Sequence, residues 1–149
     1  MVFTLDTSLV HLLHQASQAA EEIFAAGQSK DGPTPRQLAV LAAIAQNEGL
    51  SQTDIVTHTG VDRSTLADIV RRLKERGFVA RKRTKEDARA YAVKLTKEGQ
   101  HVLAEATKAA LEAEEIFATS AAVSAKARAD LVRLLLSLAN SSQKNVETK

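Results

Sequence analysis

The sequence predicts a mainly α-helical fold with one short β-hairpin, and three observations support this class. Ala, Leu, Lys, Arg and Glu recur throughout the 149 residues, whereas aromatic residues make up only 3% of them. Apolar residues recur at the three- and four-residue spacing of amphipathic helices over most of the chain. Two short segments near the middle of the chain instead alternate between apolar and polar residues, as strands do. The hydrophobic content of 44% is sufficient for a buried core.

The first predicted helix covers residues 5–26 and ends at Gly27, which begins a loop that continues to residue 33. A second helix begins after Thr34. The sequence Thr-Pro-Arg-Gln supplies an N-cap residue, a proline at the first helical position and a glutamine that can complete a capping box. We expect this helix to end between residues 47 and 49.

Two further helices are predicted to follow, with a glycine between them. Ser51 caps the first, which ends at Gly60, and Asp62 caps the second, which ends at Gly77. The second helix has one apolar stripe, formed by Leu66, Ile69, Val70 and Leu73. Two short helices joined in this way are typical of a helix-turn-helix, in which Gly60 can adopt a positive φ in the turn.

The strands are predicted at residues 78–83 and 91–95, with the charged tip of a hairpin between them. Thr96 is then placed to cap a long helix. A last helix is expected from about residue 124 to about residue 140, followed by a frayed tail at residues 141–149.

The positive charge of the chain is local. The net charge is only +2, but residues 51–100 contain twelve Lys and Arg residues against seven Asp and Glu residues, a net charge of +5. Such a cluster attracts polyanions. The outer face of the second short helix and the hairpin together provide the candidate DNA-binding residues, which are Arg63, Ser64, Thr65, Asp68, Arg71, Arg72, Arg83 and Arg89.

Two segments resemble the MarR family of bacterial regulators. They are LSQTDIVTHTGVDRSTLADIVRRLKERGFVARKR at residues 50–83 and DARAYAVKLTKEG at residues 87–99. The second is similar to the wing signature of the family, which is an Asp-x-Arg followed by an apolar-x-Leu-Thr-x-x-Gly ending. The resemblance extends from about residue 34 to residue 99.

The resemblance implies a winged helix-turn-helix that binds double-stranded DNA, in a homodimer with interlocked terminal helices on a pseudo-palindromic operator. Carried over by position, Ser64, Thr65 and Asp68 would face bases, and Arg89 would enter the minor groove. Three positions depart from the family pattern. Val56 stands where a small Ala is usual, Thr59 where a Leu is common, and Asp68 where a basic residue often contacts a base.

The two ends of the chain are predicted to form the dimer. Their helices carry too many apolar residues for one narrow buried stripe, so each needs a second partner. The candidate dimerisation residues are Leu5, Leu9, Leu12, Leu131, Leu135 and Leu138. The predicted organisation is therefore a dimerisation helix and loop (1–33), a winged helix-turn-helix DNA-binding domain (34–99) and C-terminal dimerisation helices with a tail (100–149).

The sequence contains no cysteine, no apolar run of about 20 residues and no signal peptide pattern, so we expect a cytoplasmic protein that does not enter the membrane. It has no visible catalytic motif and no cofactor loop. His11 and His14 could share a metal or effector pocket with His58 or His101, but scattered histidines without a fixed carboxylate pattern rarely form a site. We therefore expect no metal, no cofactor and no enzyme.

The preferred interpretation is a dimeric transcriptional regulator, and a repressor in particular. By analogy with the family, a small-molecule effector bound between the dimerisation helices and the DNA-binding lobe could release it from the operator. Two rival hypotheses are a winged helix used for protein interaction without sequence-specific DNA binding, and a small helical enzyme that uses His11, His14, Glu114 or Glu115. The basic hairpin argues against both.

Overall fold

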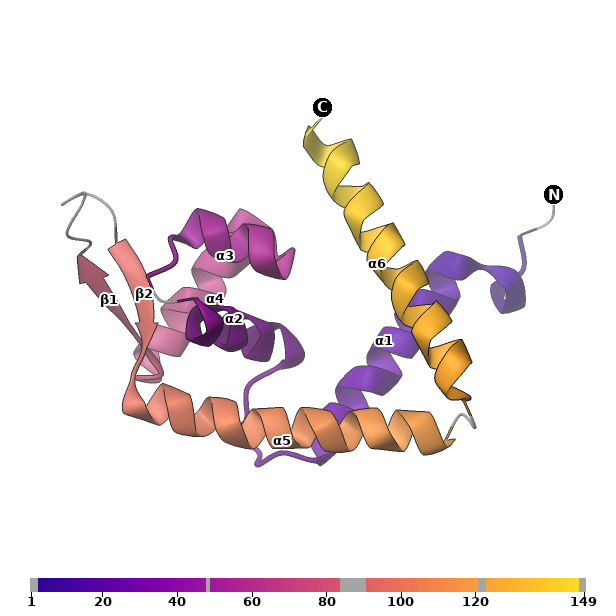
Figure 1. Cartoon of the computed structure of the whole chain (residues 1–149), viewed down its shortest axis with the longest axis horizontal. Helices are drawn as coiled ribbons and strands as arrows, with labels where there is room; N and C mark the ends of the chain where they lie inside the picture. Colours follow the sequence, from indigo (N-terminus) through magenta and orange to yellow (C-terminus); the bar gives the residue numbers. More distant parts are fainter. Residues whose placement is uncertain (1–2, 48, 84–90, 121–122, 148–149) are drawn as a thin grey trace.

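The computed structural model describes residues 3–47, 49–83, 91–120 and 123–147, with side chains described except at 82–83, 91, 120 and 142–147. The described elements, in chain order, are a 3-10 helix η1 (Leu5–Thr7), α1 (Leu9–Ala26), α2 (Pro35–Gln46), α3 (Gln52–Thr59), α4 (Arg63–Glu75), β1 (Val79–Arg83), β2 (Tyr91–Leu95), α5 (Lys97–Ser120) and α6 (Ala125–Glu147). Helices α2 to α4 and the hairpin form a lobe at one end of α5, and α6 lies at the other end (Figure 1). The predicted mainly α-helical class with one hairpin is confirmed.

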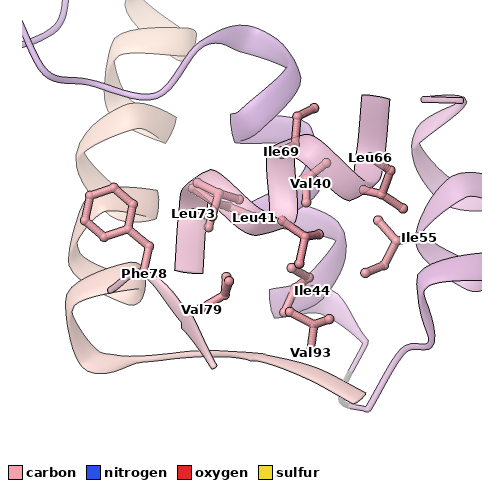
Figure 2. Close-up of a cluster of buried hydrophobic side chains, with 11 residues drawn as sticks. Val40, Leu41, Ile44, Ile55, Leu66, Ile69, Leu73, Phe78, Val79 and Val93 are labelled. Carbon is pink, nitrogen blue, oxygen red and sulfur yellow. The ribbon is translucent and has the colours of Figure 1, made fainter. Parts of the chain in front are cut away.

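The lobe is held together by one apolar core (Figure 2). The predicted stripe of α4 is buried, and it packs against α2, α3 and both strands. The buried members of this core are Val40, Leu41, Ile44, Ile55, Leu66, Ile69, Val70, Leu73, Phe78, Val79 and Val93. Because this stripe faces inward, the opposite face of α4 is turned to solvent.

The hairpin is antiparallel, and its register pairs Val79 with Leu95 and Arg83 with Tyr91. Helix α5 begins directly after β2. The Thr96 hydroxyl accepts a hydrogen bond from the Gly99 amide (3.0 Å) and donates one to the Gly77 carbonyl (2.7 Å). Thr96 therefore caps α5, as predicted, and also ties its start to the end of α4.

A second, smaller core connects the lobe to α1. Phe24 of α1 packs against a row of buried alanines on α5, with Leu38 of α2 at its edge. These alanines are Ala106, Ala109 and Ala113. Small side chains let α1 and α5 approach closely, and Leu38 of α2 also joins α1 to the lobe.

Helix α6 has little packing of its own. Among the described elements none makes an extensive contact with it, and one ion pair joins Arg128 of α6 to Glu114 of α5. Its large apolar side chains remain exposed, namely Leu131, Val132, Leu134, Leu135, Leu136 and Leu138. In Figure 1 the helix rises from the end of α5 that lies opposite the lobe, and its C-terminal end leans back toward the side of the lobe.

Two predicted helix boundaries were wrong. The first helix does not run unbroken from Leu5, because Ser8 ends η1 and caps α1, its side chain accepting from the His11 amide (3.3 Å). The last helix does not end near Asn140. It continues to Glu147 because residues 141–147 contain neither glycine nor proline. Within the described ranges, no helix is both long enough and apolar enough to cross a membrane.

Candidate nucleic-acid interface

The turn between α3 and α4 has the geometry that a helix-turn-helix requires. Gly60 has φ +67°, and its amide donates to the Val56 carbonyl (2.9 Å). The Thr59 hydroxyl donates to the Ile55 carbonyl (2.7 Å) and accepts from the Val61 amide (3.3 Å). A leucine at this position could form neither bond, so Thr59 replaces apolar packing by a polar brace across the turn.

Asp62 organises the first turn of α4. Its Oδ1 accepts from the Thr65 amide (3.0 Å) and from the Ser64 hydroxyl (2.6 Å). The hydrogen bond from the Ser64 side chain, followed by those from Thr65, holds the pKa of Asp62 well below its ordinary value. Asp62 thus caps the helix, as predicted, and also sets the direction of the Ser64 hydroxyl.

Further along α4, Asp68 binds two arginines at once. Its Oδ1 accepts from Arg71 Nη2 (2.5 Å) and its Oδ2 from Arg72 Nε (2.7 Å). Arg71 also donates through Nη1 to Glu75 Oε1 (2.8 Å). The hydrogen bond from Arg71 is the main cause that lowers the pKa of Asp68. Asp68 was predicted from the family pattern to face bases, and here both of its carboxylate oxygens are engaged by neighbouring side chains.

The predicted DNA-binding residues on α4 therefore differ in availability. Arg63 is exposed at the start of the helix, and within the described residues no ion pair involves it. Thr65 is partly buried, whereas Ser64, Arg71 and Arg72 are exposed. All of these residues lie on α4, so their proximity follows from the helix and not from packing between different elements.

The hairpin is described only in part. Arg81 of β1 is exposed on the surface of the lobe. The side chain of Arg83, and all of Arg89 and Asp87, lie outside the described residues. Their predicted roles at the phosphates and in the minor groove stay predictions.

A cavity of about 750 Å³ lies between the lobe and the longer helices. It is lined from α1 by Phe24, from α2 by Arg36 and from α5 by Phe117, and the turn before α4 contributes Gly60 and Asp62. The sequence interpretation placed an effector between these regions but assigned none of these residues to its pocket. They are far apart in the chain, and no local motif connects them.

No group of three or more His, Cys, Asp or Glu side chains in the described parts of the chain could hold a metal ion. The structure describes His11, His14, His58 and His101, and none of these histidines belongs to such a group. Chemically, the lobe offers hydrogen-bond donors and acceptors on α4 and positive charge on β1.

Comparison with known proteins agrees with this geometry. The family model described as the MarR family matches residues 31–90, from the loop before α2 to the hairpin. The PcaV transcriptional regulator from Streptomyces coelicolor, solved with its natural ligand, has the same fold with a TM-score of 0.86. It is 29% identical, and the match covers 95% of this chain and 99% of that one. The helix-turn-helix and hairpin region of this chain thus matches the MarR family.

Two other relatives are informative. A protein of Thauera aromatica, whose name describes a transcriptional regulatory protein for the hcr operon, is 34% identical over 105 residues. That match covers 70% of this chain but only 62% of the relative, so the chain spans less than two thirds of its length. The transcriptional repressor CouR, solved on a 23-mer DNA duplex, has a TM-score of 0.80 and 27% identity over 93% of this chain and 99% of its own. The relatives are regulators of transcription and not enzymes.

Proposed function

We propose that this MarR-family chain is a cytoplasmic transcriptional regulator that binds a pseudo-palindromic operator as a homodimer. The observation that carries the proposal is α4, whose apolar stripe is buried while its opposite face presents Ser64 and Arg71 to solvent. A helix anchored in this way can lie in the major groove with polar side chains toward base edges. The hairpin beside it would contact the phosphates.

The homodimer is supported by the apolar surface at the ends of the chain. All six candidate dimerisation leucines are exposed in the single chain, from 41% at Leu12 to 72% at Leu9. A second copy would cover them, because contiguous apolar patches of this kind mark interaction sites. Twofold symmetry would then place two α4 helices on half-sites about one duplex turn apart.

We further propose that the chain is a repressor released by a small molecule in the 750 Å³ cavity. The wall of this cavity includes Gly60 and Asp62, which set the position of α4. A ligand that prefers one position of the lobe relative to α1 and α5 lowers operator affinity by the free energy of that preference. CouR, similar in fold, was solved both on DNA and with p-coumaroyl-CoA, so relatives with this fold bind both classes of ligand.

The proposal is tested by fluorescence anisotropy with duplex DNA from the region flanking the gene, across a salt series. If phosphates are engaged, the logarithm of the binding constant falls steeply with the logarithm of salt concentration. Arg89→Ala should weaken binding by about 1 to 3 kcal/mol if this arginine reads the minor groove. A flat salt response in the wild type would reject DNA binding. Unchanged affinity in Arg89→Ala would remove that residue alone from the interface.

A further inference from the structure

The solvent-facing ridge of α4 carries acidic as well as basic side chains. Ser64, Asp68, Arg71 and Glu75 follow one another at spacings of four, three and four residues, so they form one line along the helix. This line lies opposite the buried stripe. It is the part of α4 that would lie nearest the DNA under the proposed function, yet two of its four members are carboxylates.

These carboxylates neutralise the arginines beside them. Asp68 uses one oxygen for Arg71 (2.5 Å) and the other for Arg72 (2.7 Å), and Glu75 takes the second Nη of Arg71 (2.8 Å). Two cations are thus matched by two anions in a continuous network. Arg63, at the start of α4, takes no part in these ion pairs.

This network opposes binding to phosphates in general. To reach a phosphate, Arg71 or Arg72 must leave a carboxylate, and Asp68 then remains near the negatively charged backbone. Exposed ion pairs are individually weak, so a well-placed competing partner can open the network. The amino groups of cytosine and adenine are such partners, because they donate hydrogen bonds in the major groove to side-chain acceptors.

We propose that Asp68 is a specificity-determining residue that withholds Arg71 and Arg72 from DNA of arbitrary sequence. At the operator, a cytosine or adenine amino group donates to the Asp68 carboxylate and frees an arginine for a neighbouring guanine or phosphate. On DNA of other sequence, the Asp68 carboxylate stays paired with both arginines. This inference rests on the proposed function, since it assumes that α4 lies in the major groove.

The test compares Asp68→Asn with Asp130→Asn. Both variants remove an exposed carboxylate that pairs with an arginine three residues later, but Asp130 lies on α6 and pairs with Arg133. The probes are a mixed-sequence 30-base-pair duplex and a duplex that the wild-type protein selects from a random pool. Anisotropy across a salt series measures the affinity and the salt slope for each protein with each duplex.

For Asp68→Asn we expect binding to the mixed-sequence duplex to tighten by about tenfold, with a salt slope steeper by about 1 to 2, because the arginines are free to contact phosphates. Its preference for the selected duplex should fall by about tenfold or more. Asp130→Asn should match the wild type in both measurements. Unchanged binding and preference in Asp68→Asn, or the same changes in Asp130→Asn, would overturn the role of Asp68.

A measurement without DNA examines the network itself. In the wild type, the Arg71 and Arg72 side-chain NH signals should show slower exchange with water than that of Arg63, and Asp68→Asn should abolish the difference. Equal exchange at all three arginines in the wild type would also overturn the inference. A wild type that selects no duplex and binds DNA independently of salt would overturn the proposed function itself. A wild type that selects a duplex, with an Asp68→Asn variant that behaves identically, would overturn only the role of Asp68.

Discussion

At the scale of single residues, Asp62 connects the two functional features of the lobe. Its carboxylate caps α4 and directs the Ser64 hydroxyl, and the same residue lies in the wall of the large cavity. A molecule that attracts or displaces this carboxylate would disturb the first turn of the proposed DNA-binding helix. Asp62 is therefore a direct physical connection between the cavity and the candidate interface.

The cap predicts a pH dependence of stability. Because hydrogen bonds lower the pKa of Asp62 in the folded state, the ionised carboxylate stabilises the fold above the unfolded pKa of about 4. This contribution is lost as the pH falls below that value. Asp62→Asn keeps the cap but removes the charge, so its melting temperature should lie below that of the wild type at neutral pH, and the gap should narrow as the pH falls below about 4.

Thermal unfolding followed by circular dichroism at a series of pH values measures this gap. Asp62→Ala is the companion variant, because it lacks both the charge and the cap and should melt lower than Asp62→Asn. A gap between wild type and Asp62→Asn that stays constant down to about pH 2 would contradict the assignment.

The residue-scale features that the sequence predicts are the local ones. The caps at Thr34, Ser51 and Asp62 were all predicted and are confirmed, because each depends on residues no more than three positions away. The state of Asp68 could not be predicted in the same way. Several partners lie within reach of its side chain, and the spacing alone does not determine which of them it binds.

At the scale of elements, α5 and the residue before β1 approach each other closely. Gly99 lies in the first turn of α5, where an added Cβ would come within 1.9 Å of the Phe78 carbonyl oxygen. The Phe78 carbonyl also accepts from the Thr96 amide (3.0 Å), so it cannot easily move away. This explains in physical terms the glycine that ends the Leu-Thr-x-x-Gly motif.

Gly99→Ala should therefore lower the free energy of unfolding by about 1 to 3 kcal/mol, because the helix must shift away from β1. Urea denaturation measures this change. Gly27→Ala is the matched control, since a Cβ there would meet its nearest atom at 3.4 Å, an ordinary contact, and the φ of −82° suits alanine. An equal loss in both variants would show that the Phe78 contact is not the cause.

Most elements were predictable because apolar periodicity and helix stops are both local signals. Gly60 and Gly77 separate the elements as expected, and both have positive φ. The errors occurred where those signals conflict. Ser8 interrupts an apolar pattern that otherwise continues through it, and the polar residues after Asn140 resemble a tail although nothing in them breaks a helix.

At the scale of the whole molecule, the exposed apolar face of α6 predicts a partner. Helix α5 carries the helix-turn-helix lobe at one end and leads into α6 at the other (Figure 1). The surplus of leucines in the sequence predicted an interface, and that interface stays a prediction. The cavity could not be predicted residue by residue, since its lining comes from α1, α2, α5, the last residue of α3 and the turn before α4.

If α6 forms the dimer, replacing Leu135 with aspartate should yield monomers, because a charge would be buried in an apolar interface. Leu135 is 42% exposed in the single chain, so the substitution should leave the lobe folded. Ser137→Asp, with its exposed side chain on a different side of α6, is the control and should remain dimeric. Sedimentation equilibrium measures the mass of each, and circular dichroism verifies the fold.

The same pair of variants connects assembly to DNA binding. A monomer holds one half-site, whereas the dimer positions two α4 helices together, so Leu135→Asp should lose operator binding while Ser137→Asp retains it. Anisotropy with the selected duplex measures this difference. A wild type that sediments as a monomer, or a monomeric Leu135→Asp with full operator affinity, would contradict the twofold arrangement and leave the exposed leucines of α6 to some other partner.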